Sequence, residues 1–309
     1  MPCCKTKEAA AHWLVLLAAV LWGTIGTARS FAPELASSAT IAAVRLLIGG
    51  TGLLLLAFRL GILNTIKGLN VGTIMLAAAG LAAYQPFFFS GIAKTGVAVG
   101  TVVTIGSSPI LSGILGFLIN RERPRGRWFI ATTLSVMGCV ILIIGGNSVS
   151  VNTYGVAMSL GAGFGYALYS VVTKRLMENR DPLAVVATVN FTAALMLSPT
   201  LVTGNLSWLA GPRGLTVALY MGLFTCMLAY ALFSRGLARL PVSTAVTLSL
   251  AEPLTAALLG IFVLGEKLAL PVFIGAGLLL AGLGVLSLNL EGVVRLLRKG
   301  FGHHERVNR

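Results

Sequence analysis

The chain has 309 residues, of which 56% are hydrophobic and only 10% are charged, and its formal net charge is +14. Soluble domains carry about 25% charged residues, so this composition excludes a water-soluble domain of comparable length. Glycine accounts for 37 residues, above the usual share of about 7%, and small residues let membrane helices approach closely.

Ten apolar runs follow one another between Ala11 and Asn289. A helix of about 20 apolar residues crosses the hydrocarbon core of a bilayer. We therefore predict ten transmembrane helices, over residues 11–28, 36–58, 71–93, 98–119, 127–145, 153–174, 183–203, 214–234, 242–264 and 269–289. The linkers are short and carry glycine and proline, which excludes an extramembrane domain between the spans. The first run also has the features of a signal peptide, but no A-x-A cleavage site follows it.

The positive charges are distributed unevenly over the predicted loops. With the N-terminus in the cytoplasm, 18 of the 23 lysines and arginines fall on the cytoplasmic side and four on the other, while Arg45 lies inside a span. The positive-inside rule then places both termini in the cytoplasm, and the net charge needs no nucleic-acid partner to explain it. The basic tail, residues 291–309, either lies on the anionic inner surface of the membrane or is a solvated orientation signal.

An internal repeat relates the two halves of the chain at an offset of 144 residues. The matched features are Phe89-Ser90 with Phe233-Ser234, Ser108-Pro109 with Glu252-Pro253, Gly116 with Gly260, Glu122 with Glu266, and Gly138 with Gly282. We predict an N-terminal repeat over residues 1–146 and a C-terminal repeat over 147–290, followed by the tail. Because five spans is an odd number, the second repeat must be inverted in the membrane. Inverted repeats are a transporter architecture with the substrate site between the halves, near the midplane.

Four sequence blocks carry a resemblance to a known family. They are Leu21-Trp22-Gly23, Val44-Arg45-Leu46, the segment from Ser108-Pro109 through Gly116 to Glu122, and the segment from Ala251-Glu252-Pro253 through Gly260 to Glu266. The chain resembles the drug/metabolite transporter superfamily in its ten-helix EamA-type branch, which includes bacterial amino-acid exporters of the YddG and threonine/homoserine kinds. This resemblance implies an all-α membrane protein in which spans 1–4 and 6–9 surround a central cavity and spans 5 and 10 lie outside. It also implies that Glu252-Pro253 belongs partly to the scaffold.

Arg45 and Glu252 are the two charged residues near the middle of predicted spans. A charge at a helix centre costs about 2.5–3.5 kcal/mol on insertion scales, so each must face a partner or a wet cavity. In one interpretation Arg45 binds a substrate carboxylate and Glu252 binds an amino group or a proton, which suits an amino acid. In the other the two charges pair with each other, or with backbone freed near Pro253, and only hold helices together.

Other candidate binding residues are aromatic or amide side chains at middle depths, although the interfacial belt or helix packing explains any single one more readily. They are Trp22, Tyr84, Gln85, Phe88, Tyr166, Tyr169, Asn190 and Tyr230. Four prolines are predicted helix breaks, a feature that often lines transporter sites but is also tolerated elsewhere. They are Pro86, Pro109, Pro199 and Pro253. Trp128 and Trp208 lie at span ends and are assigned to the aromatic belt.

The sequence lacks the motifs that several other function classes require. There is no G-x-x-x-x-G-K-[ST] for ATP hydrolysis, the three histidines are terminal, and the four cysteines lack metal-ligand spacing. We therefore expect no cofactor, no metal, no catalytic residue and no enzymatic activity. The expected function is export of amino acids, including aromatic and other neutral ones, and of related metabolites by alternating access. The alternative is export of cationic drugs or other metabolites; a channel or a membrane enzyme is a remote alternative.

The expected partners are the small-molecule substrate and membrane lipids. The small-x-x-x-small pattern Gly277-x-x-x-Ala281 is suited either to dimerisation or to packing within one chain, so a monomer or a weak homodimer is expected. The bacterial inner membrane is the expected location. If transport is coupled to protons, Glu252 is the one evident carrier; otherwise the protein is a facilitator.

Overall fold

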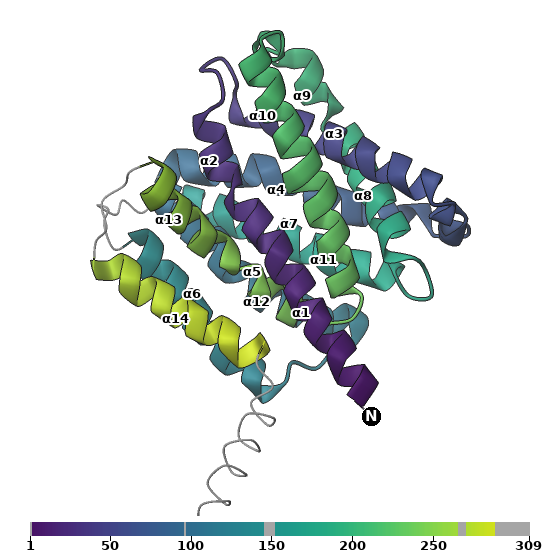
Figure 1. Cartoon of the computed structure of the whole chain (residues 1–309), viewed down its shortest axis with the longest axis vertical. Coiled ribbons are helices and arrows are strands. Elements are labelled where there is room, and N and C mark those ends of the chain that lie inside the picture. Colours follow the sequence, from purple (N-terminus) through teal and green to yellow (C-terminus); the bar gives the residue numbers. More distant parts are fainter. Residues whose placement is uncertain (1, 96, 145–151, 265–269, 288–309) are drawn as a thin grey trace, which may run out of the picture.

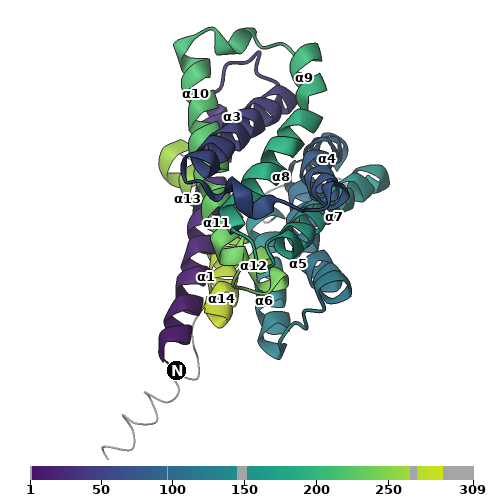
Figure 2. The same cartoon turned by 90° about the vertical axis from the view of Figure 1, so that its right-hand side faces the viewer.

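The computed structural model describes residues 2–95, 97–144, 152–264 and 270–287. Every regular element in these ranges is helical, and Figures 1 and 2 show the helices gathered into one bundle. The first half contains α1 (Pro2–Gly23), α2 (Ile25–Ser30), α3 (Ser38–Arg59), η1 (Ile62–Ile66), α4 (Val71–Thr95), α5 (Val97–Asn120) and α6 (Gly126–Ile144). The second half contains α7 (Thr153–Leu176), α8 (Pro182–Met196), α9 (Ser198–Thr203), η2 (Ser207–Leu209), α10 (Pro212–Gly222), η3 (Leu223–Leu228), α11 (Ala229–Leu237), α12 (Val242–Leu248), α13 (Ala251–Leu264) and α14 (Leu270–Ser287).

The helices are long and apolar, as an integral membrane protein requires. Within the described residues, seven helical stretches have the length and hydropathy to cross a bilayer, and three shorter apolar helices accompany them. The shorter ones, Gly126–Leu142, Pro182–Met196 and Phe273–Ser287, coincide with three of the predicted spans. The chain is therefore a multi-pass, all-α membrane protein, whereas the count of ten crossings stays a prediction.

Side-chain caps explain where several helices begin. Asp181 accepts hydrogen bonds from the backbone N–H groups of Leu183 and Ala184 at 2.8 and 3.2 Å, and Pro182 occupies the first turn of α8. Asn152 caps α7 by accepting from the N–H of Gly155 at 3.1 Å. Such caps satisfy N–H groups that have no partner inside the helix. These polar residues therefore determine where each helix begins, which an apolar sequence alone specifies poorly.

The two halves of the chain are interleaved. The most extensive helix pairs are α4 with α7, α6 with α14, α5 with α7, α3 with α8 and α1 with α11. Each of these pairs joins an element of the first half to one of the second. In Figures 1 and 2, α6 and α14 lie together at one edge of the bundle. The interior of the bundle is therefore formed by both halves together rather than by either one.

Two glycines allow a close approach between α4 and α7. A Cβ atom added to Gly80 would lie 2.8 Å from the carbonyl oxygen of Gly165, and one added to Gly165 would lie 2.8 Å from that of Gly80. Real Cβ atoms essentially never come this close. The backbones therefore touch at a point that only glycine permits, as is common between membrane helices.

A polar cluster at one end of the bundle joins the halves a second time. Glu122 forms an ion pair with Lys174 at 2.5 Å through Oε1, and its Oε2 accepts a hydrogen bond from the N–H of Val242 at 2.7 Å. The Lys174 ammonium also donates to the carbonyl of Leu240. We call Glu122, Lys174, Leu240 and Val242 the Glu122 clamp. It fixes the segment after α5 to the end of α7 and to the start of α12.

The predicted helix breaks fall into two groups. Pro86 and Pro109 lie inside α4 and α5, which continue past them, so the structure has no interruption there. A proline removes one N–H donor, and packed membrane helices tolerate that loss. Pro199 and Pro253 occupy the first turns of α9 and α13, each just after an interruption of the helix.

The two tryptophans assigned to the aromatic belt are buried instead. Trp128 is 7% exposed and donates from its indole N–H to the hydroxyl of Thr247 at 3.0 Å, and Trp208 is 3% exposed. An indole near a span end has the same sequence signature whether it faces lipid or a neighbouring helix. Trp128 faces α12 because Thr247 offers it an acceptor.

Gly165→Ala is expected to destabilise the protein, because its methyl group would collide with the backbone of α4. Overpacking of this kind costs about 1–3 kcal/mol, so thermal unfolding in detergent should shift to a lower Tm. Gly277→Ala on α14 is the matched control, because a Cβ there meets nothing within 4 Å. Equal Tm values for the two variants would contradict the close α4–α7 contact.

Glu122→Gln is expected to lower the Tm as well, because Lys174 loses its carboxylate while its side chain remains only 20% exposed. The cost should lie between that of exposed and buried pairs, about 1–3 kcal/mol. Glu178→Gln, at an exposed position after α7, serves as the control. A Tm for Glu122→Gln that matches this control would show that the clamp contributes nothing to stability.

Candidate functional site

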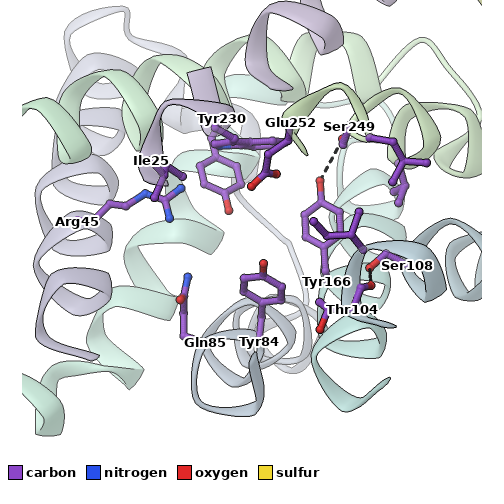
Figure 3. Close-up of a pocket in the computed structure, with 14 residues that line it drawn as sticks. Ile25, Arg45, Tyr84, Gln85, Thr104, Ser108, Tyr166, Tyr230, Ser249 and Glu252 are labelled. Carbon is purple, nitrogen blue, oxygen red and sulfur yellow. Dashed lines mark hydrogen bonds between the residues drawn. The ribbon is translucent and has the colours of Figure 1, made fainter. Parts of the chain in front are cut away.

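A cavity lies between the two halves, and seven of the ten predicted binding residues line it (Figure 3). They are Trp22, Arg45, Tyr84, Gln85, Tyr166, Tyr230 and Glu252. The empty space among the lining residues is about 590 Å³, including the part that is open to solvent. This volume also counts the space between side chains, so it is an upper limit on what a ligand could occupy.

Three predicted residues, Phe88, Tyr169 and Asn190, do not line the cavity. The Phe88 ring stacks on Tyr84 with centroids 5.7 Å apart and an interplanar angle of 10°. The Tyr169 hydroxyl donates to Oδ1 of Asn190 at 3.2 Å, and both side chains are fully buried. These three residues support the wall from behind, whereas binding of a substrate by any of the ten stays a prediction.

The wall also contains residues that the sequence analysis did not name as binding candidates. They are Ile25, Thr104, Ile105, Ser108, Val246, Ser249 and Leu250. The repeat offset gives one signal, because it pairs Ser108 with Glu252. The aliphatic wall residues carry no such signal in the sequence. An aliphatic side chain in a membrane span looks the same in sequence whether it faces lipid, a neighbouring helix or a cavity.

Four aromatic side chains from different helices line the cavity. The ring centroids of Trp22 lie 5.2 Å from those of Tyr230 and 6.4 Å from those of Tyr166, both in edge contact, and Tyr84 lies 6.1 Å from Tyr166. Figure 3 shows the hydroxyls of Tyr84 and Tyr230 pointing into the cavity. The Tyr166 hydroxyl is engaged with Ser249 at 3.4 Å. The wall thus combines apolar ring faces with polar tips, as suits an amphiphilic ligand.

Arg45 reaches the cavity from the middle of α3. Its Nε donates to the hydroxyl of Thr225 at 3.0 Å, and its Nη2 donates to the carbonyl of the same residue at 3.0 Å. A guanidinium has five N–H donors, and within the described ranges Arg45 makes no further hydrogen bond. Figure 3 shows the guanidinium pointing into the cavity. The remaining donors are therefore available to a ligand.

Glu252 stands in the first turn of α13, directly after the interruption at Ser249 and Leu250. Its backbone N–H donates to the carbonyl of Ser249 at 3.0 Å. In the part of the chain that the structure describes, its carboxylate has neither a hydrogen bond nor an ion pair. Arg45 and Glu252 therefore face one cavity without pairing with each other, and the scaffold interpretation in which they pair is not what the structure has.

The arrangement places one guanidinium and one carboxylate at the same cavity, whose wall combines polar and apolar side chains. No group of three or more His, Cys, Asp or Glu residues that could hold a metal ion occurs among the described residues. Arg45 and Glu252 present opposite charges to the same cavity.

Comparison with known proteins gives a family model and several relatives. The model described as "EamA-like transporter family" matches residues 9–144 and 153–288, two segments that begin 144 residues apart. The chain is 44% identical to the uncharacterized transporter YwfM of Bacillus subtilis over 88% of this chain and 92% of that one. It is 27% identical to the uncharacterized inner membrane transporter YicL of Salmonella typhimurium over 89% and 94%.

Two further matches concern function and fold separately. The threonine/homoserine exporter RhtA of Escherichia coli is 35% identical over 158 residues, which cover 50% of this chain and 52% of that protein. A solved crystal structure superposes with a TM-score of 0.77 at 20% sequence identity, covering 89% of this chain and 95% of that one. The second match shows the fold alone.

Proposed function

The chain belongs to the EamA-like transporter family, and on that premise we propose that it is a secondary carrier of amino acids. The observation that carries this proposal is the pair of opposite charges, Arg45 and Glu252, which face one cavity without neutralising each other. A zwitterion satisfies both charges at once. The relationship to a threonine/homoserine exporter over half of the chain supports the same substrate class.

In the proposed complex the free N–H groups of Arg45 bind the substrate carboxylate. A guanidinium and a carboxylate form paired, charge-assisted hydrogen bonds. The Glu252 carboxylate accepts from the substrate ammonium. The aromatic rings of Trp22, Tyr84 and Tyr230 pack against the substrate side chain, so neutral amino acids, including aromatic ones, are the favoured cargo.

The proposed transport cycle follows from the two repeats. We propose ten transmembrane helices in two inverted five-helix repeats, with both termini in the cytoplasm of a bacterium and the protein in its inner membrane. The halves rock about the cavity so that the substrate site meets one side of the membrane at a time. In this topology the Glu122 clamp lies at the cytoplasmic end, and export is the physiological direction.

One observation favours a second candidate substrate class. The Glu252 carboxylate has no partner among the described residues, and the rings of Trp22 and Tyr230 line the same cavity. A carboxylate beside aromatic faces also binds organic cations, which gain from cation–π contact. Such a drug would need Glu252 but not Arg45, so the two classes are separable by substitution.

Purified protein in liposomes is expected to take up labelled neutral amino acids in a saturable manner without an imposed proton gradient. The physical reason is that both charges of the substrate find partners in the cavity, so binding needs no coupled ion. Uptake that requires the gradient would instead make Glu252 the proton carrier. Uptake of organic cations but of no amino acid would favour the second candidate.

Arg45→Ala is expected to raise the KM for amino acids by about tenfold to a hundredfold, because a charge-assisted hydrogen-bonded pair is worth about 1.5–3 kcal/mol. Arg59→Ala, an exposed position at the end of the same helix, should leave the KM unchanged. Thermal unfolding of both variants confirms folding. Unchanged amino-acid uptake by folded Arg45→Ala would remove Arg45 as a ligand and with it the zwitterion proposal.

A further inference from the structure

The helix that packs against Arg45 contains an irregular segment. Residues Leu223–Leu228 are π-helical and lie between α10 and α11, within the single membrane-crossing stretch Pro212–Leu237. The green helix in Figure 1 runs through this segment without a chain break. π-helical turns are rare and occur frequently at functional sites. The cavity contains no residue of this segment, so its role must be indirect.

Thr225 connects the π-helical segment to the cavity. It is fully buried and presents two acceptors to Arg45, its hydroxyl to Nε and its carbonyl to Nη2, both at 3.0 Å. The hydroxyl in turn donates to the carbonyl of Met221 at 2.7 Å, which orients its lone pairs toward the guanidinium. In a regular α-helix a carbonyl is occupied by the N–H four residues on. A π-helical turn shifts that register, which suits a carbonyl that accepts from outside its own helix.

Close packing keeps this contact in place. One helical turn along α3 from Arg45, a Cβ added to Gly49 would lie 2.8 Å from the carbonyl oxygen of Gly222, just before the π-helical segment. The backbones of α3 and of this segment therefore approach each other closely beside Arg45. The two acceptors of Thr225, one on its side chain and one on its backbone, fix both the position and the plane of the guanidinium.

We infer that Thr225 is a positioning residue for substrate recognition: it holds the guanidinium of Arg45 so that the remaining N–H groups meet the substrate carboxylate. The inference rests on the proposed function, since it concerns the orientation of its carboxylate-binding group. A guanidinium held on one side by fixed acceptors loses less rotamer freedom when it binds a ligand on the other. Thr225 thereby acts on affinity for the carboxylate without touching the substrate.

The test is Thr225→Val, which keeps the size and branching of the side chain and removes the hydroxyl. We expect the KM for a neutral amino acid to rise about three- to tenfold, the effect of one hydrogen bond to a charged group, with kcat changed less than twofold. Competition by the corresponding primary amine, which lacks the carboxylate, should be unaffected. Thr225→Ser should have the wild-type KM, because serine retains the hydroxyl.

Two controls separate positioning from a general loss of structure. Thr216→Val lies in α10 of the same continuous stretch, where the exposed hydroxyl donates to the carbonyl of Pro212. Its KM should equal that of the wild type. In an Arg45→Ala background, Thr225→Val should add no further rise in KM, because residues acting through one contact are not additive. A merely structural role would instead add its effect in both backgrounds.

The outcomes also distinguish this inference from the proposal beneath it. A large KM effect of Arg45→Ala together with a wild-type KM for Thr225→Val overturns the positioning role and leaves the carrier proposal intact. An Arg45→Ala variant with unchanged amino-acid uptake overturns both. If Thr225→Val does not fold, Thr225→Ser and Thr225→Ala are compared, and equal KM values for these two overturn the inference.

Discussion

A guanidinium inside the bundle, with no carboxylate partner in the described part of the chain, is the constraint around which this structure is arranged. The cost of placing Arg45 within a span is met by two acceptors from Thr225 and by a cavity that leaves its other donors accessible. Glu252 meets the same cost differently, in the first turn of α13, where the helix dipole favours a negative charge. Regular α-helix is interrupted next to each of these charges. The break before α13 lies beside Glu252, and the π-helical segment before α11 lies beside Arg45.

The cavity exists because the two halves are interleaved rather than placed side by side. Close contacts such as Gly80 with Gly165 bring helices of opposite halves together at their backbones, while large rings such as Trp22 and Tyr230 fill the space nearer the cavity. The Glu122 clamp joins the halves again at one end. The binding groups are therefore held by contacts between the halves, so any relative movement of the halves must alter the cavity.

Much of this arrangement is readable from sequence because a bilayer imposes simple rules. Apolar length placed most helices within a few residues of the observed bounds, although α1 begins nine residues before the predicted span. Isolated charges pointed to Arg45 and Glu252. Other features leave no trace in one sequence. The π-helical segment is a plain apolar run apart from Thr225, and Val246 and Leu250 have no polar signature that marks a cavity face. Phe88, Tyr169 and Asn190 are of the right chemical type but lie one layer behind the wall, a distinction that depends on helix rotation.

The interleaving has a consequence for how the chain is made. During insertion by the translocon, α4 emerges with its glycine contact uncovered, and its partner α7 is synthesised only after α5 and α6. Likewise α3 and α1 are synthesised before the helices they pack against, α8 and α11. The nascent first half has only the smaller contacts among its own helices, such as α4 with α5 and α5 with α6. Its packing is completed only when the second half has been inserted.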